Sequence, residues 1–175
     1  MEPNKAPGPD GFSFHFYQIC WSVIRKYLLR MIKAFQVKSE VGGYTNSTFL
    51  SLIPKEANPS SFDRFRPISL CNASYKIFSK ILVNRLKPLL EKLISPLQWG
   101  FAKGRHILDN VRQVQEAMHS SFLRKEKGML IKLDMANAFD RVKHSFLFSV
   151  LHSFGFSSAF LNLIKACIHN PWIAP

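Results

Sequence analysis

The first half of the chain opens on a helical spacing of apolar residues. Between Phe16 and Phe35 the apolar side chains recur every three or four positions, which is typical of one face of an amphipathic helix. Ser13 is placed to cap the start of this helix, and Gly42 and Gly43 are expected to end it. Its basic residues fall largely on the other side: Arg25, Lys26, Arg30 and Lys33.

Two short apolar runs follow, and each carries a proline. They are STFLSLIPK, residues 47–55, and RFRPISL, residues 64–70, with the polar segment EANPSSFD between them. Each run is too short for a good helix, so the pattern predicts two strands joined by a long hairpin loop. Lys55 and Arg66 then stand at or near that loop.

A long helix is predicted over NASYKIFSKILVNRLKPLLEKLIS, residues 72–95. Its apolar residues fill a wide arc, and opposite them runs a narrow basic stripe of Lys76, Lys80 and Lys87. Pro88 is expected to kink or break the helix. Arg85 falls inside the apolar arc, so its charge either reaches out to solvent or meets an anion or carboxylate.

The second half of the chain alternates loops, helices and one strand. Residues 96–110 read as a loop, and a helix is predicted from about residue 109 to residue 124. MLIKLD, residues 129–134, is expected to be a buried strand, and residues 145–156 and 158–170 read as two further helices. This mixed order, rich in helices with few strands, is typical of the α+β class.

The excess of basic over acidic residues indicates what kind of partner the protein binds. The chain has 24 Lys and Arg against 11 Asp and Glu, a net charge of +13. Such an excess is typical of proteins that bind nucleic acid, or less often an acidic membrane surface. A soluble basic protein without such a partner is the alternative.

The cysteines and the N-terminus bear on the compartment. Cys20, Cys71 and Cys167 lie far apart and form no C-x-x-C pair, so neither a disulfide framework nor a zinc site is expected. The first residues have no apolar core of a secretory signal, and no apolar run approaches a membrane span. An intracellular protein without a membrane partner is therefore expected.

The segment IKLDMANAFDRV, residues 131–142, carries the most specific chemistry. Asp134 stands at the end of the predicted strand, where a carboxylate at a sheet edge can hold magnesium. Two-metal phosphoryl transfer needs several such acids close together. Asp140 is either another of them or a helix cap. The alternative is that two acids six residues apart have no common role.

Each group of basic residues has two possible interpretations. Lys55 and Arg66 are either exposed charges on a solvated hairpin or a clamp for a triphosphate. The stripe of Lys76, Lys80 and Lys87 is either a solvated face or a track for a nucleic-acid backbone. The loop KGRH, residues 103–106, has the same two readings.

The order of the segments is more informative than any one of them. NKAPGPDGF, LIPK, FRPISL, KIFSKILVNRLK, QWGFAKGR, LDN and KLDMANAFDRV occur in one line along the chain. Together they resemble the reverse transcriptase of plant LINE-type, non-LTR retrotransposons, over essentially the whole chain. The resemblance implies an RNA-directed DNA polymerase with a right-hand fold. Its implied partners are an RNA template, a DNA primer and deoxynucleoside triphosphates, with Mg²⁺ or Mn²⁺ as cofactor, and it implies a nuclear location.

The family pattern also implies roles for single residues. Asp134 matches the first metal-binding aspartate of the palm, and Phe139 matches the aromatic gate that rejects the ribose 2′-hydroxyl. Asn137 and Ala138 sit where backbone amides approach the triphosphate. The pattern assigns the nucleotide's phosphates to Lys55 and Arg66. The loop with Gly104 and Arg105 matches a motif that lies along the template side. The residues expected to bind nucleic acid are therefore Lys103 and Arg105, together with the stripe of Lys76, Lys80 and Lys87.

The chain departs from the family pattern after residue 175. The pattern continues with a Gly-containing loop and with an aromatic-Ala-Asp-Asp hairpin that supplies the other metal-binding acids, and these 175 residues contain no adjacent acids. We therefore expect the fingers region over residues 1–95 and a truncated start of the palm over residues 96–175, inactive as a polymerase by itself.

Other functions stay open at this point. A maturase-like reverse transcriptase of the group II intron type shares the ancestral layout, although FRPISLCNASYKIFSK favours the plant LINE branch. A non-catalytic RNA-binding module that keeps the basic surface belongs to a different class. An inactive retroelement relic is the third alternative. The oligomeric state does not follow from the sequence.

Overall fold

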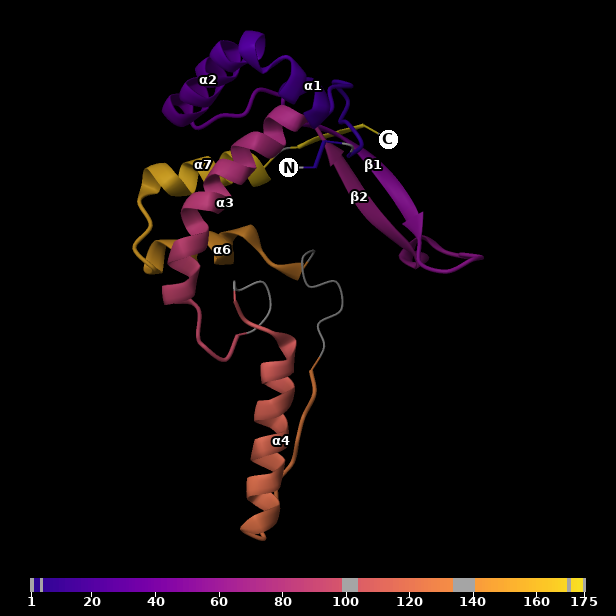
Figure 1. The fold of residues 1–175 in the computed structure, drawn as a ribbon, viewed down its shortest axis with the longest axis vertical. Coiled ribbons are helices and arrows are strands. Elements are labelled where there is room, and N and C mark those ends of the chain that lie inside the picture. Colours follow the sequence, from indigo (N-terminus) through magenta and orange to yellow (C-terminus); the bar gives the residue numbers. More distant parts are fainter. Residues whose placement is uncertain (1, 4, 99–103, 134–140, 170, 175) are drawn as a thin grey trace. The chain divides into compact units, whose positions relative to one another are not determined.

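The computed structural model describes residues 2–3, 5–98, 104–133, 141–169 and 171–174, and it has a mixed, helix-rich α+β fold (Figure 1). The chain forms two compact units. The first unit comprises residues 1–84 and 155–175, and the second comprises residues 85–154. The α+β class predicted from the order of the elements is confirmed.

The first unit begins with two helices where the sequence predicted one. They are α1 (Phe14–Ile19) and α2 (Trp21–Lys38), and they separate at Cys20. The hydroxyl of Ser13 accepts a hydrogen bond from the Phe16 N–H at 3.4 Å, so the predicted cap is confirmed. α2 ends before the glycines expected to stop it, because Ser39 takes the left-handed conformation, with φ 52°, and closes the last turn onto Phe35.

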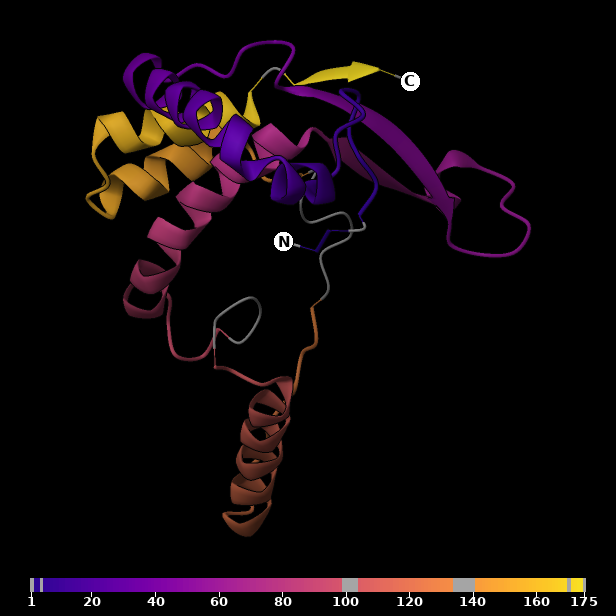
Figure 2. The same cartoon turned by 45° about the horizontal axis from the view of Figure 1, so that its top comes forward.

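The sheet of this unit is built on the predicted hairpin. β1 (Ser47–Pro54) and β2 (Phe65–Cys71) pair antiparallel, with Leu52 opposite Pro67, and a 3-10 turn, η1 (Phe62–Arg64), lies in the loop between them. The two strands form a long ribbon that extends away from the helices of the same unit (Figures 1 and 2). A third strand, β3 (Trp172–Ala174), pairs parallel to the start of β1 and was not predicted.

Helices α3 (Ala73–Leu93) and α7 (Ser158–Ile168) complete the first unit and supply most of its core. The aromatic rings of Phe35 and Phe78 stack in parallel with centroids 5.1 Å apart. The other buried members of this core are Leu82, Leu163 and Cys167. Burying a large apolar side chain of this kind contributes about 1.5–3 kcal/mol, so this core holds α2, α3 and α7 together.

Polar groups at the edge of this core are matched. The Tyr75 hydroxyl donates to the Cys167 carbonyl oxygen at 2.7 Å. Burial raises the pKa of Tyr75 to about 12 and that of the Cys167 thiol to about 11. Both groups are therefore neutral at physiological pH, and Cys167 is a packing residue with an unreactive thiol.

The N-terminal turn is fastened to the start of α3 through Asn72, whose side chain is almost fully buried at 1% exposure. Its Oδ1 accepts from the Asp10 N–H at 3.0 Å, and its Nδ2 donates to the Tyr44 carbonyl at 2.8 Å and to the Thr45 carbonyl at 3.4 Å. Gly8 lies so close that a Cβ there would be 2.4 Å from the backbone nitrogen of Asn72. One amide thus joins three segments that are distant in sequence.

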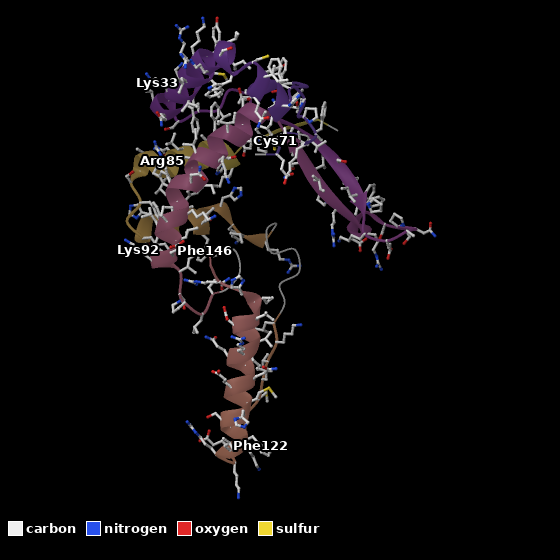
Figure 3. The ribbon with its side chains drawn as sticks, viewed as in Figure 1. Lys33, Cys71, Arg85, Lys92, Phe122 and Phe146 are labelled. Atoms are coloured by element: carbon white, nitrogen blue, oxygen red, sulfur yellow. The ribbon has the colours of Figure 1, made fainter. Side chains whose placement is uncertain are left out.

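The second unit contains the C-terminal part of α3, together with α4 (Ile107–Leu123) and α6 (His144–Ser153). α3 continues through Pro88, so the proline does not end the helix. Arg85 is exposed, which agrees with the expectation that its charge reaches out to solvent. The helices α6 and α7 confirm the two predicted near the C-terminus, and Gly155 follows α6 with φ +84°. Phe122 lies near the end of α4 (Figure 3).

The predicted buried strand after α4 is wrong for the residues that the structure describes. Residues 128–133 run beside α4 without strand pairing, and Met129 and Leu133 are exposed by 85% and 87% (Figure 1). An apolar run becomes a strand only where a neighbouring strand satisfies its backbone groups. No described strand lies in this unit to provide that partner.

A membrane-spanning segment is likewise not found in the described part of the chain. None of the helices there combines the required length with the required apolar character.

Candidate nucleotide-binding hairpin

The far end of the β1–β2 hairpin carries a cluster of charged side chains. The ladder places Ile53 opposite Arg66, and the Lys55 N–H donates to the Arg64 carbonyl at 2.8 Å, which extends the pairing beyond β1. Side chains two residues apart share a face of a strand, so Lys55 lies on the same face as Ile53 and its partner Arg66. The two cations singled out from the sequence are therefore neighbours on one exposed face.

Lys55 is oriented by the loop of the hairpin. Its Nζ donates to the Asp63 carbonyl oxygen at 2.6 Å, which leaves two further donors of the ammonium group directed to solvent. The Asp63 carbonyl oxygen has no formal charge, so this hydrogen bond does not neutralise the charge of Lys55. The ammonium group is thus held at the hairpin tip with its charge available for an anion.

Arg64 stands directly across from Lys55 and was missed by the sequence reasoning. Its guanidinium lies 3.4 Å from Glu56 Oε2 and 3.8 Å from Asp63 Oδ2. Both pairs are exposed, and such pairs contribute at most about 1 kcal/mol, so an anion of higher charge can compete for the guanidinium. The signal that could have found Arg64 is its spacing of two residues from Arg66, which is the period of a strand.

The acidic groups at the tip limit its positive potential. A hydrogen bond from the Ser61 hydroxyl lowers the pKa of Asp63, and the charges of Arg64 and Lys55 lower it further. Asp63 is therefore ionised at neutral pH. Three cations and two acids, Glu56 and Asp63, leave the tip with a net positive charge.

The predicted nucleic-acid stripe lies in α3. Lys80 and Lys87 are exposed, whereas Lys76 is half-buried with its Nζ 5.9 Å from the centroid of the Phe14 ring. Such a contact between a cation and an aromatic ring fixes the lysine beside α1. Lys76 is thus partly committed to packing within the first unit, while the other two lysines are open to solvent.

Arg105 has a well-defined role inside the second unit. Its guanidinium donates to the carbonyl oxygens of Ser95 at 2.6 Å, Gln98 at 2.5 Å and Ile94 at 3.3 Å. These carbonyls follow the C-terminus of α3, where unsatisfied acceptors gather. The arginine therefore closes this end of the helix, and its assignment to nucleic acid stays a prediction.

Five predicted site residues lie outside the described residues: Lys103, Asp134, Asn137, Ala138 and Phe139. The structure does not test the geometry expected for them. Within the described ranges, no three or more His, Cys, Asp or Glu side chains come together in a way that could hold a metal ion.

The family is established by comparison with known proteins. The profile of the reverse transcriptase (RNA-dependent DNA polymerase) family matches residues 53–174, which include the whole hairpin tip. The chain belongs to this family. The resemblance stated from the sequence motifs is thereby confirmed at the level of the family.

The curated relatives are proteins of transposons and retrotransposable elements. The chain is 32% identical to a transposon TX1 uncharacterized 149 kDa protein of Xenopus laevis, over 94% of this chain and 13% of that protein. It is 26% identical to a Pol polyprotein from the type-1 retrotransposable element R2 of Popillia japonica, over 95% of this chain and 22% of that protein. It is 24% identical to the RNA-directed DNA polymerase from the mobile element jockey of Drosophila funebris, over 82% of this chain and 16% of that protein. The chain thus spans less than a quarter of the length of these relatives.

Proposed function

We propose that this chain forms the fingers and the start of the palm of a retrotransposon RNA-directed DNA polymerase, with the β1–β2 hairpin contacting the triphosphate of the incoming nucleotide. The observation that carries the proposal is the placement of Lys55 and Arg66 on one exposed face of the hairpin, inside the segment shared with the family. An ammonium and a guanidinium side by side suit a triphosphate, because charge-assisted hydrogen bonds to phosphate oxygens are the strong ones.

The remaining roles are proposed on the resemblance of motifs. Asp134 would hold a divalent metal, whose chemistry is to stabilise charge on the transferred phosphoryl group. Phe139 would exclude the 2′-hydroxyl, with the backbone at Asn137 and Ala138 beside the nucleotide. An RNA template, a DNA primer, a nuclear location and descent from the plant LINE branch belong to the same proposal, as does a fingers–palm boundary near residue 95.

The hairpin is tested in a polymerase that contains this segment together with the rest of its palm. Lys55→Ala is expected to raise the KM for deoxynucleoside triphosphates by about 10- to 100-fold, the value of one or two charge-assisted hydrogen bonds. Steady-state primer extension measures it. Lys92→Ala is the matched control, since it removes the same charge from the exposed end of α3. An unchanged KM in Lys55→Ala would contradict the proposed contact.

Nucleic-acid binding by the chain itself is expected to be independent of sequence and sensitive to salt. The basis is the net charge of +13 and the exposed lysines of α3. Each phosphate neutralised should weaken binding by about 0.7 to 0.9 log units per log unit of salt, through counterion release. Fluorescence anisotropy with one labelled RNA across a salt series measures the slope, and a flat dependence would speak against a phosphate-binding surface.

A non-catalytic RNA-binding module is the second candidate, favoured by the same excess of positive charge. The two functions differ at the hairpin. In a module that only binds RNA, Lys55→Ala and Lys92→Ala would have the same small effect on affinity, and neither would change nucleotide use.

A further inference from the structure

The segment from Gly11 to Ser39 contains no acidic residue, although it carries Arg25, Lys26, Arg30, Lys33 and Lys38. It comprises α1 and α2, which lie in the first unit away from the tip of the hairpin (Figures 1 and 2). An acid-free run of this length with five cations has a positive potential that acidic neighbours in the segment do not offset. The matching partner is a polyanion.

An aromatic hollow of about 440 Å³ lies where α1 meets α2, lined by Phe14, Tyr17, Gln18 and Trp21. Phe14 is buried beneath the Lys76 ammonium group. Tyr17 is half-buried, and burial together with the charge of Asp10 raises its pKa. The contact between Phe14 and Lys76 of α3 fixes one side of the hollow, whereas Trp21 is 50% exposed. A flat aromatic face is thus presented to solvent beside a rigid wall.

Cations continue from this hollow along α2. Trp21, Arg25 and Lys33 are spaced by multiples of four residues, so they lie on one inclined ridge of the helix surface. Each step of four residues advances about 6 Å along the helix axis and turns about 40° around it. Arg25 and Lys33 are both exposed, and Lys33 is marked in Figure 3. The ridge flanks the buried side of α2 formed by Leu28 and Phe35.

We propose that α1 and α2 bind a single-stranded nucleic acid, with one base stacked on Trp21 in the hollow and the following backbone phosphates at Arg25 and Lys33. Aromatic platforms beside a basic track are the usual means of binding single strands without sequence preference, because every base has a flat face. A protein partner fits less well, since the hollow is small and the cations beside it, Lys76 and Arg25, outnumber the one acid that acts on Tyr17, Asp10. The site is separate from the hairpin and requires no polymerisation.

The proposal is tested with the chain itself and a fluorescein-labelled single-stranded RNA of mixed sequence. Trp21→Ala is expected to weaken binding by about 5- to 150-fold, the range for loss of one base stack, and Trp21→Phe should retain most of the affinity. Trp172→Ala, which removes another exposed tryptophan of the first unit, is the matched control and should bind as the unsubstituted chain does.

A duplex RNA of the same sequence distinguishes the contribution of base stacking to binding from the contribution of charge. Its bases are already stacked on one another, so Trp21→Ala should not alter its affinity, whereas Arg25→Gln should weaken both single-stranded and duplex binding. The proposal is overturned if Trp21→Ala weakens the binding of both RNAs equally, or weakens the binding of neither. In a variant with both Trp99→Phe and Trp172→Phe, Trp21 is the remaining tryptophan. Single-stranded RNA should quench the fluorescence of Trp21 in this variant. An unquenched signal overturns the proposal, even if the Trp21→Ala variant does not fold.

Discussion

Replacing Asn72 by Ala is expected to lower the free energy of unfolding by about 3 kcal/mol, because the change leaves several backbone groups without a partner. The amide of Asn72 is the acceptor for the Asp10 N–H and the donor for the Tyr44 and Thr45 carbonyls. An alanine fills none of these roles, and water has little access to a site that is 1% exposed. Urea denaturation followed by circular dichroism measures the change.

Two companion variants make this test specific. Asn84→Ala, on the exposed side of α3, should change stability by no more than about 0.5 kcal/mol. Asn72→Asp keeps an acceptor for Asp10 but loses both donors to the carbonyls, so it should be destabilised as well. Stability equal to that of the unsubstituted chain in both Asn72 variants would show that the amide does not hold the N-terminal turn.

Replacing Asp134 by Ala in a polymerase that contains this segment is expected to lower primer extension by at least about 10³-fold. A metal ion that stabilises the transferred phosphoryl group is worth several kcal/mol, and each 1.36 kcal/mol is a factor of ten in rate. Asp140→Asn is the control, because in this segment the resemblance assigns the metal to Asp134, and the variant should keep most of the activity. Extension of a labelled primer on an RNA template with Mg²⁺ measures both.

The isolated chain should not extend a primer above background. Two-metal transfer requires several acids within a few ångströms, the sequence has no adjacent acids, and the described residues bring no such cluster together. Extension by the isolated chain that disappears in Asp134→Ala would contradict this, and would mean that Asp109 or Asp140 completes the site.

Local patterns predicted the elements whose partners are near in sequence. The hairpin was found because β1 and β2 pair across one loop, and the cap at Ser13 acts within a single turn. β3 was missed because three residues at the far end of the chain pair with β1 more than 120 positions away. The strand expected over residues 129–134 is wrong in its described part, residues 129–133, for the related reason that an apolar run does not specify its partner.

The prediction of the candidate site was limited in the same way, because contacts between residues distant in sequence do not follow from local patterns. Lys55 and Arg66 were brought together correctly because the strand period fixes which side chains share a face. The central place of Asn72 was not predicted, since its side chain binds Asp10, sixty-two positions earlier, and a sequence offers no sign of that contact.

The contact between Gly8 and Asn72 makes two positions that lie far apart in sequence depend on each other. A side chain at position 8 would place a carbon 2.4 Å from both the backbone nitrogen and Oδ1 of Asn72, a distance that van der Waals radii forbid. A larger residue at position 8 therefore requires the start of α3 to shift. Position 8 lies outside the family match over residues 53–174, so a boundary drawn at residue 53 would omit the residue that covers one of its own buried amides.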